Sequence, residues 1–401
     1  MSLTNISVEN AQAAINQHVQ PLPVITRPLR ELSGAILAQS IYMERDQPPF
    51  DRVAMDGIAF DSRSAALQSG LKIAGTQAAG ATPLALPSSS HCIEVMTGAV
   101  LPAGCDCVIP VERIRRENDM AYLNDDVQPE AWLNVHRRGS DAAKGDEILK
   151  PGARLRSVDI AAIASAGYAS VKVHTMPRVA VISTGDELIE PGKPIEDWQI
   201  RRSNSYALLS ALHKHGFTDV TDVHLRDDPD TLRTQLSALL ERHDALVISG
   251  GVSTGRFDFV PQVLNDIGVT TVFHKVRQRP GRPMWFGARN DGKVVYALPG
   301  NPVSVLMCMY RYVLRGLLRA MGMTSLRYES ANIRTTVQPL PELVQFLPVV
   351  IVEHAATVKV KPWPTKGSGD LVSLLGSDGF VEILPGDKYI ATNTTLRYFR
   401  W

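Results

Sequence analysis

Three segments of the chain end a run of apolar residues in small polar residues that could bind an anion. In the most complete of them, apolar residues from Leu246 onward run into a Ser-Gly-Gly sequence at 249–251. Hydroxyl groups, exposed backbone N–H groups and little side-chain bulk let such a loop approach an anion and hydrogen-bond it. Asp244 precedes the segment and Asp258 ends it. A small-residue loop between two carboxylates predicts a site for an anionic substrate with a divalent cation.

Two further segments share this order of residues. The run that begins at Arg178 ends in Ser-Thr-Gly at 183–185, followed by Asp186 and Glu187. The run that begins at Val294 enters the sequence LPGNPVS at 298–304, which feeds the N-terminus of a predicted helix. Ligands of open α/β sheets bind outside the carboxyl ends of the strands. We therefore expect the three turns to face one crevice.

A basic loop at 277–283 lies in the sequence between the segment that ends at Asp258 and the segment that begins at Val294. It places three arginines among proline and glycine residues. The planar guanidinium group suits bidentate contact with a phosphate or another oxyanion. The alternative is an ordinary basic turn on the surface, since exposed charges alone carry little meaning.

Two polar loops in the N-terminal half carry further candidates. The proline-rich loop at 47–57 contains Asp51 and Asp56, and either connects domains or presents these carboxylates to a site. The loop at 134–146 contains His136 and Asp141 within a charge cluster. Such a cluster is usually a solvated loop, but a neighbouring domain or subunit could also reach it.

The elements that must position these residues follow from periodicity. Strand and helix alternate from Pro177 to about Met323, which predicts one doubly wound α/β domain. Within it, Asp230 is expected to cap a helix with four leucines on one face, beginning at Leu232. Short β-like runs separated by Gly, Pro and Ser predict a β-rich inserted unit and a small all-β C-terminal domain. The expected boundaries are 1–47 with 137–176 for a linking and dimerisation subdomain, 48–136 for the β-rich insert, 177–325 for the α/β domain and 326–401 for the C-terminal domain.

Composition excludes several classes of protein. The chain has 401 residues, 42 Lys and Arg against 41 Asp and Glu, and a net charge of +1, so nothing indicates a nucleic-acid partner. Four cysteines in this length do not predict a disulfide framework. The N-terminus does not resemble a signal peptide, and no apolar run is long enough to span a bilayer. We therefore expect a cytoplasmic protein without a membrane partner.

Taken together and in this order, the motifs resemble those of the molybdopterin molybdenumtransferase family, which includes the catalytic C-terminal domain of gephyrin. The motifs that carry the resemblance are PPFDRVAMDG (48–57), MTGAVLP (96–102), STGDEL (183–188), SGGVSTGRFD (249–258), RPGRP (279–283) and LPGNPVS (298–304).

The resemblance implies an α/β multidomain fold with a molybdopterin-binding doubly wound domain. It also implies a homodimer whose active site is shared, with the AMDG loop supplied by the partner subunit. The implied reaction inserts molybdate into adenylylated molybdopterin with Mg²⁺ and releases AMP. Transferred position by position, the implied catalytic residues are Asp56, Glu187 and Asp141, and the implied metal ligands are Asp244, Asp258 and Glu187. The implied substrate-binding residues are Thr97, Ser249, Gly250, Gly251, Ser253, Arg279, Arg282, Pro299, Gly300, Asn301 and Ser304.

Five positions depart from the family pattern. Val53 and Ile58 stand where Ser and Tyr are usual around AMDG, and Arg256 replaces an acidic residue. Arg279 and Arg282 stand where lysines are usual. Arginine differs from lysine in the geometry of its hydrogen-bond donors and in volume. These departures leave an alternative open, a divergent paralogue that binds molybdopterin or acts as a scaffold without catalysis. A second alternative keeps the chemistry but takes tungstate in place of molybdate.

Overall fold

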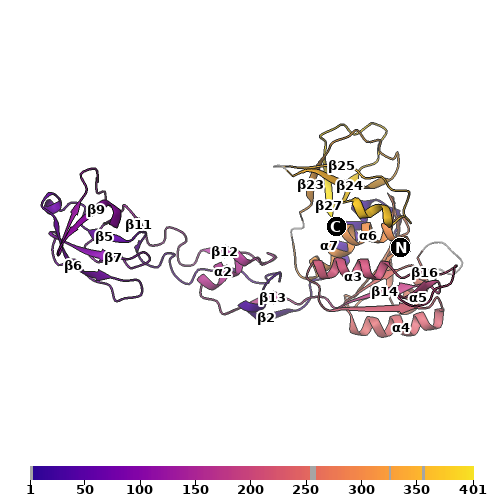
Figure 1. Cartoon of the computed structure of the whole chain (residues 1–401). Coiled ribbons are helices and arrows are strands. Elements are labelled where there is room, and N and C mark those ends of the chain that lie inside the picture. Colours follow the sequence, from indigo (N-terminus) through magenta and orange to yellow (C-terminus); the bar gives the residue numbers. More distant parts are fainter. Residues whose placement is uncertain (1–2, 253–258, 325–326, 355–356) are drawn as a thin grey trace. The chain divides into compact units, whose positions relative to one another are not determined.

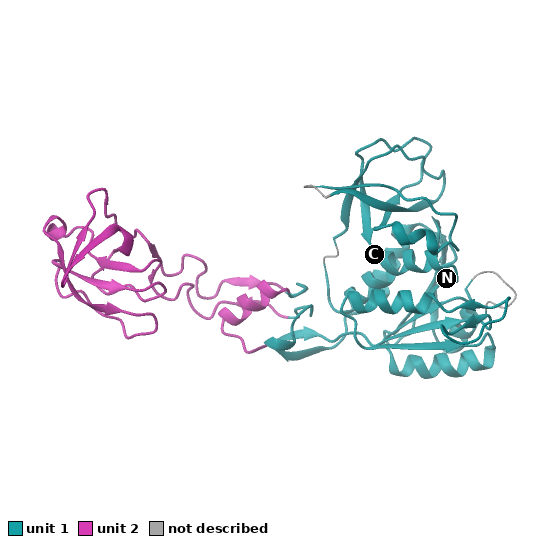
Figure 2. Cartoon of the chain, viewed as in Figure 1, with its two compact units in different colours: residues 1–38, 151–155, 171–401 teal, residues 39–150, 156–170 magenta. Residues whose placement is uncertain are grey.

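The computed structural model describes residues 3–252, 259–324, 327–354 and 357–401. The chain divides into two compact units (Figure 2). The larger unit contains residues 1–38, 151–155 and 171–401, and the smaller unit contains residues 39–150 and 156–170. The subdomain boundaries expected from the sequence are finer than this division and stay predictions.

A seven-stranded mixed sheet lies at the centre of the larger unit (Figure 1). Its four strands β22, β18, β14 and β17 are parallel to one another, and β21 is antiparallel to β22. In spatial order the strands are β1 (Leu3–Ile6), β19 (Thr270–Val276), β21 (Trp285–Ala288), β22 (Val294–Leu298), β18 (Ala245–Ser249), β14 (Val179–Thr184) and β17 (Val220–Leu225).

Alternate residues of the parallel strands enter two different cores. The helices are α1 (Val8–His18), α3 (Asn204–Lys214), α4 (Pro229–Arg242), α5 (Val260–Asp266), α6 (Pro302–Cys308) and α7 (Leu314–Ala320). Val179 and Val181 of β14 pack in the core that includes helices α1, α3 and α7. Ala180 and Ile182 pack in the core that includes helices α4 and α5. A strand buried on both faces reads as a continuous apolar run, which is why these segments were recognisable in the sequence. The predicted doubly wound domain is confirmed.

Two helix caps illustrate where local sequence decided the structure. The Ser7 hydroxyl accepts a hydrogen bond from the N–H of Asn10 at 3.1 Å and caps α1. The prediction that Asp230 caps α4 was wrong: Asp228 is the cap, and its carboxylate accepts from the N–H of Thr231 at 2.8 Å. Pro229 takes the first helical position, where its missing N–H costs nothing, so the cap falls on the residue before it.

One continuous helical rod at 302–320 changes its winding midway. Between α6 and α7, residues Met309–Val313 form a π-helical segment. Arg311 and Tyr312 of this segment are both fully buried. The helix predicted after the LPGNPVS segment is present, and its change of winding has no signal in the apolar periodicity.

The C-terminal part of the larger unit is a small closed barrel. Its strands follow the order β24, β25, β23, β27 and β26, and β26 pairs with β24 to close it. The two-residue strand β20 (Gln278–Arg279) adds to this barrel beside β24. The strand bounds are β23 (Glu329–Ile333), β24 (Val344–His354), β25 (Val358–Pro362), β26 (Gly379–Ile383) and β27 (Thr395–Arg400). The predicted all-β C-terminal domain is confirmed.

The smaller unit is built on a six-stranded sheet and one short helix, α2 (Ser157–Ser165). In spatial order the strands are β8 (Cys107–Pro110), β5 (Gly57–Phe60), β7 (His91–Val95), β6 (Leu71–Gln77), β10 (Met120–Leu123) and β9 (Ile114–Glu117). Its two short ladders pair β11 (Val135–His136) with β4 (Arg52–Val53) and β12 (Glu147–Leu149) with β3 (Ile41–Tyr42). The larger unit has two more, β2 (Val24–Pro28) with β13 (Ser170–His174) and β15 (Leu188–Ile189) with β16 (Ile200–Arg201).

No helix in the described part of the chain combines the length and the apolar composition that crossing a membrane requires.

Candidate active site

The carboxyl ends of four parallel strands line one cavity of about 530 Å³ in the larger unit. Ser183 and Thr184 end β14, and Ser249 ends β18. Asp227 follows β17, and Gly300 follows β22. The strands run parallel, so their carboxyl ends meet at one edge of the sheet. The expectation that the three small-residue turns face a common crevice is met by these lining residues.

Two buried hydroxyl groups in this cavity have no hydrogen-bond partner among the described residues. They are Thr184 Oγ1 and Ser249 Oγ, and their residues are only 4 % and 2 % exposed. A buried hydroxyl without a partner costs free energy, so nearly all such groups in native proteins are satisfied. A ligand with oxygen atoms in this cavity would supply the missing partners.

The glycines after β18 are required by close packing. Gly250 and Gly251 both have positive φ angles, of 99° and 66°. A Cβ atom on Gly250 would lie 2.8 Å from the carbonyl oxygen of Thr184. Only glycine combines this backbone conformation with so close an approach to another backbone. The loop therefore packs its backbone directly against the carboxyl end of β14.

Two carboxylates line the same cavity. Glu187 lies in the turn after β14, and Asp227 follows β17. The sequence analysis identified Glu187 and missed Asp227, although the residues after β17 obey the same strand-end rule as the other three turns. No group of three His, Cys, Asp or Glu side chains suited to a metal occurs among the described residues.

Asp244 lies at the other end of its strand. It precedes β18, whereas Ser249 ends it, so the structure does not bring the two together. The Asp244 carboxylate binds the Arg178 guanidinium, with Oδ1 2.8 Å from Nη2 and Oδ2 3.1 Å from Nε. Burial raises the pKa of Asp244, but the hydrogen bonds from Arg178 outweigh burial and leave the pKa below its ordinary value. The structure therefore gives Asp244 a structural partner rather than a place at the predicted metal site.

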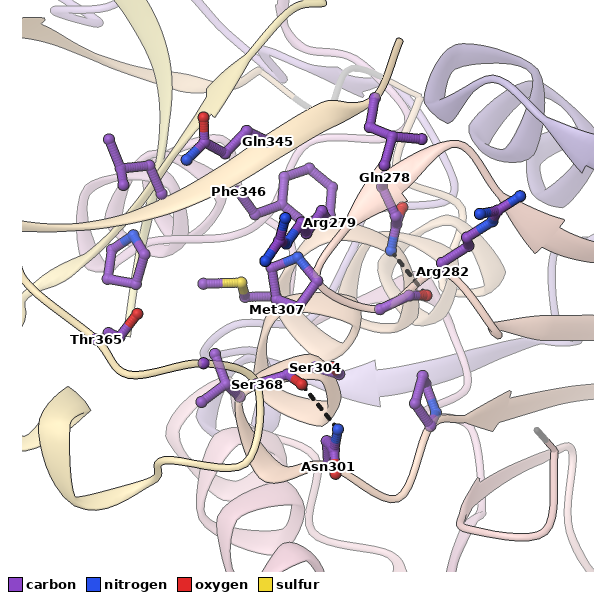
Figure 3. A pocket seen from close by; sticks show the side chains of 18 of the residues that line it. Gln278, Arg279, Arg282, Asn301, Ser304, Met307, Gln345, Phe346, Thr365 and Ser368 are labelled. Atoms are coloured by element: carbon purple, nitrogen blue, oxygen red, sulfur yellow. Dashed lines mark hydrogen bonds between the residues drawn. The ribbon is translucent and has the colours of Figure 1, made fainter. Parts of the chain in front are cut away.

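A second cavity, of about 840 Å³, lies between the α/β domain and the C-terminal barrel within the larger unit (Figure 3). Its lining includes the predicted residues Arg279, Arg282, Pro299, Gly300, Asn301 and Ser304, together with Gln345 and Lys366, which the sequence analysis missed. Gly300 and Asn301 line both cavities. The two cavities therefore share a wall.

Arg279 and Arg282 of the basic loop point in different directions. Figure 3 shows Arg282 directed away from Arg279, and Arg282 Nη2 donates a hydrogen bond to Asn5 Oδ1 of β1 at 3.2 Å. Both residues line the larger cavity, but only Arg282 also lines a third cavity beside Asn5. Arg279 is therefore the loop cation with the clearer access to the larger cavity.

The shared wall is fixed by a loop of the C-terminal domain. Asn301 Nδ2 donates to Ser368 Oγ at 2.7 Å, and the N–H of Val303 donates to the Ser368 carbonyl oxygen at 3.1 Å. On composition the segment 367–370 is more typical of a plain tight turn than of a ligand-binding loop. In the structure Gly367 and Ser368 line the larger cavity, and Gly369 lines the smaller one.

Three predicted positions lie outside the described residues. They are Ser253, Arg256 and Asp258.

In the smaller unit, the structure brings together Asp56 and Thr97. The Asp56 carboxylate accepts hydrogen bonds from the Thr97 N–H at 2.6 Å and from the Thr97 hydroxyl at 2.7 Å. These bonds lower the pKa of Asp56 below its ordinary value, because they stabilise the ionised form. Gly57 fixes the turn, since a Cβ atom there would lie 1.9 Å from the Ile109 carbonyl oxygen. The result is an exposed carboxylate that stays ionised.

Asp141 lies at the end of a hydrogen-bonded chain in the same unit. Arg52 Nη2 donates to His136 Nδ1 at 2.9 Å, and His136 Nε2 lies 2.8 Å from Asp141 Oδ1. A guanidinium can only donate, so Nδ1 accepts and the ring proton lies on Nε2, facing Asp141. The ring of His136 therefore orients the Asp141 carboxylate.

Three family models match the chain in order. The MoeA N-terminal region (domain I and II) matches residues 6–167. A probable molybdopterin binding domain matches residues 180–319, and the MoeA C-terminal region (domain IV) matches residues 331–399.

A protein of Synechocystis named molybdopterin molybdenumtransferase is 36% identical to this chain over 401 residues, which cover 99% of this chain and 100% of the relative. The chain belongs to the molybdopterin molybdenumtransferase family. A relative of the same name in Haemophilus influenzae is 35% identical over 299 residues, or 73% of this chain and 72% of the relative. The resemblance inferred from the motifs is confirmed, and the family is one of transferases.

Solved structures agree with this assignment. A molybdopterin biosynthesis MoeA protein from Pyrococcus horikoshii is 30% identical, with a TM-score of 0.79 and coverage of 99% of both chains. A second structure of that name is 26% identical, with a TM-score of 0.81 over 99% of this chain and 100% of the other.

Two of the departures from the molybdopterin molybdenumtransferase pattern lie in hydrophobic cores. Val53 and Ile58 are each 1 % exposed and belong to different apolar clusters of the smaller unit. An apolar side chain at such a position packs against its apolar neighbours. Both substituted side chains therefore lie in the interior, whereas the Asp56 carboxylate between them is exposed.

Proposed function

We propose that this protein inserts molybdate into adenylylated molybdopterin in a Mg²⁺-dependent reaction that releases AMP. The observation that supports it best is the pair of cavities joined at Gly300 and Asn301. One offers buried hydroxyls, a closely approachable glycine backbone and carboxylates, and the other offers cations. An adenylylated pterin and a tetrahedral oxyanion need adjacent sites of these two kinds.

The smaller cavity suits the pyrophosphate group of the substrate. Thr184 and Ser249 supply hydroxyls that lack partners among the described residues, and the glycine loop at 250–251 supplies a backbone that a phosphate can approach. Cleavage adds water across the phosphoanhydride bond and gives AMP and the pterin monophosphate. Such a reaction depends on positioning and on stabilising charge. No protein nucleophile is required.

Mg²⁺ fits the donors of this cavity. It takes oxygen ligands from one or two carboxylates and completes its shell with phosphate oxygens and water. Glu187 and Asp227 line the cavity and would hold the ion. When bound, it would neutralise charge on the phosphates.

The larger cavity suits molybdate. Arg279 and Lys366 supply positive charge, and Ser304 supplies a hydroxyl. The arginine fork can bind two oxygens of a tetrahedral dianion. We include tungstate as a competing oxyanion, because these contacts recognise charge and shape alone.

We further propose a cytoplasmic homodimer with a shared active site, in which Asp56, Thr97 and Asp141 come from the partner subunit. The support is that these three residues belong to a different compact unit from Glu187 and Asp227. A symmetric dimer lets one unit of each chain complete the site of the other.

The direct test supplies purified protein with adenylylated molybdopterin, molybdate and Mg²⁺ and measures AMP release. We expect Glu187→Gln and Asp227→Asn each to lower the rate by about 10²-fold or more, since each removes a charge next to the reacting phosphates. The matched control is Asp244→Asn, which removes the same charge at the opposite end of β18 and should keep the wild-type rate.

Tight pterin binding by the wild-type protein without AMP release would reject the proposal in favour of the non-catalytic paralogue. Equal losses in the Asp227 and Asp244 variants would reject the placement of the site.

A further inference from the structure

Gln278 is a fully buried amide directly beside the cation that faces the larger cavity. It precedes Arg279 in strand β20 and is 0% exposed. We propose that Gln278 and Tyr312 are positioning residues that fix the backbone of the basic loop and so aim Arg279 at the oxyanion. The inference rests on the proposed function for the identity of that oxyanion, whereas the bracing of the loop can be tested without it.

The Gln278 amide is hydrogen-bonded on both sides. Its Nε2 donates to the Gly281 carbonyl oxygen at 3.2 Å, as Figure 3 shows, and lies 3.4 Å from Cys308 Sγ. Its Oε1 accepts from the Tyr312 hydroxyl at 2.5 Å. The amide therefore ties the turn of the loop to the α6 and π-helical segments.

The loop is closed tightly onto this amide. Gly281 has a φ of 89°, and a Cβ atom at this position would lie 2.7 Å from both Cys308 Sγ and Gln278 Nε2. No larger residue fits without moving the loop away from Gln278. The Gly281 turn and the Gln278 amide are therefore close-packed as well as hydrogen-bonded.

The apolar residues around the Gln278 amide make its burial unfavourable unless its hydrogen bonds are formed. Cys308 and Tyr312 belong to the main apolar core of the larger unit, where an unpaired amide would be costly. A methionine of similar length would fill such a space without needing partners. The hydrogen bonds of Gln278 are what distinguish it from an apolar filler, and they join the Gly281 turn of the loop to Tyr312 of the π-helical segment.

Strand geometry transmits the restraint to the arginine. Consecutive side chains of a strand point to opposite sides, so a fixed Gln278 also fixes the direction in which Arg279 leaves the backbone. On its other side the loop is held by the N–H of Val344, which donates to the Arg277 carbonyl oxygen at 3.0 Å. Without the amide, the turn at Gly281 loses the hydrogen bond that links it, through Gln278, to Tyr312 and keeps the weaker one from the Cys308 thiol to its carbonyl oxygen, at 3.9 Å.

The position of Tyr312 depends on the change of helix winding. It lies in the π-helical segment Met309–Val313, and its neighbour Arg311 is directed to Gln12 and Glu382 instead. Single π-helical turns often occur at functional sites. Here the π-helical turn lets the adjacent buried residues Arg311 and Tyr312 bind different partners.

The test compares Tyr312→Phe and Gln278→Met with Tyr296→Phe. Tyr296 is a matched control, because its hydroxyl is buried in the same core and has no hydrogen-bond partner among the described residues. The first readout is hydrogen exchange in the ligand-free protein at the Met284 amide, which donates to Gly281 O at 3.2 Å. The second is the Kd for molybdate by calorimetry, with Tm measured for each variant.

We expect both brace variants to lower protection at Met284 and to raise the molybdate Kd by about 3- to 10-fold, the effect of losing a hydrogen bond. Tyr296→Phe should change neither. Unchanged exchange and unchanged Kd in both brace variants would overturn the inference, as would a uniform loss of protection across the whole chain. If the wild-type protein binds no molybdate, the proposed function fails, and the exchange measurement alone decides whether the loop is braced.

Discussion

At the residue scale, the best-defined candidate is the Asp56 carboxylate with its two hydrogen bonds from Thr97. Both residues were predicted from the resemblance. In the structure Thr97 follows β7 and Asp56 immediately precedes β5, and the two are in contact. The bonds lower the pKa of Asp56 from its ordinary value of 3.8. Its ionised form is therefore the one that the fold stabilises.

Replacing Thr97 with Val should raise the pKa of Asp56 toward that ordinary value, because the hydroxyl donor is lost. The lowered pKa contributes stability that is present above pH 3.8 and is lost as the pH falls through the folded-state pKa. The variant should therefore be less stable than the wild type near neutral pH, with the difference vanishing in acid. An NMR titration of the Asp56 carboxyl carbon measures the shift directly. An unchanged titration midpoint would show that the hydroxyl does not hold the carboxylate.

How far the sequence predicts the site depends on where each residue lies relative to a strand. Glu187, Ser249 and Gly300 follow strands that read as apolar runs, so their common edge could be predicted. Asp227 obeys the same rule but follows β17, whose alternating residues give a weaker apolar signal. Asp244 precedes β18, as the sequence shows, so strand-end reasoning does not bring it to this edge; it was a candidate only through the resemblance. Lys366 reaches the larger cavity only because the barrel packs on the α/β domain, which no local pattern indicates.

At the element scale, one buried ion pair joins three parts of the larger unit. Arg311 Nε donates to Glu382 Oε2 at 2.6 Å, and both side chains are 1% exposed. Arg311 also donates to Gln12 Oε1 of α1 at 2.8 Å. The pair thus connects the π-helical segment, the barrel strand β26 and the N-terminal helix.

Arg311→Met should destabilise the protein by about 3–5 kcal/mol, because it leaves the Glu382 carboxylate buried without its main partner. Urea unfolding followed by circular dichroism measures the loss. The double variant with Glu382→Leu should recover part of it, since both charges are then gone. A single variant as stable as the wild type would show that Arg397, which also binds Glu382 at 2.9 Å, suffices.

The elements themselves were largely predictable, and the exceptions have physical causes. Apolar periodicity identifies the parallel strands and the leucine face of α4. It does not separate Asp228 from Asp230 as the cap, because both precede the leucine face and Pro229 decides between them. The addition of β1 beside β19 and the π-helical segment depend on tertiary packing, for which the local sequence carries no periodic signal.

At the scale of the whole molecule, the candidate residues fall into two compact units. Asp56, Thr97 and Asp141 belong to the smaller unit, and the two cavities belong to the larger one. A homodimer with shared sites predicts that these two sets act together across subunits. This is the central claim of the proposed mechanism, and it can be tested without a structure of the complex.

The measurement is AMP release from a mixture of two inactive variants, Asp56→Asn and Glu187→Gln, after their subunits have been exchanged. If each site takes Asp56 from one subunit and Glu187 from the other, half of the subunits pair as heterodimers with one intact site. The mixture should then recover about a quarter of the wild-type rate, as expected for a symmetric dimer. A mixture no more active than either variant alone, under conditions in which sedimentation shows exchanged dimers, would contradict the shared site.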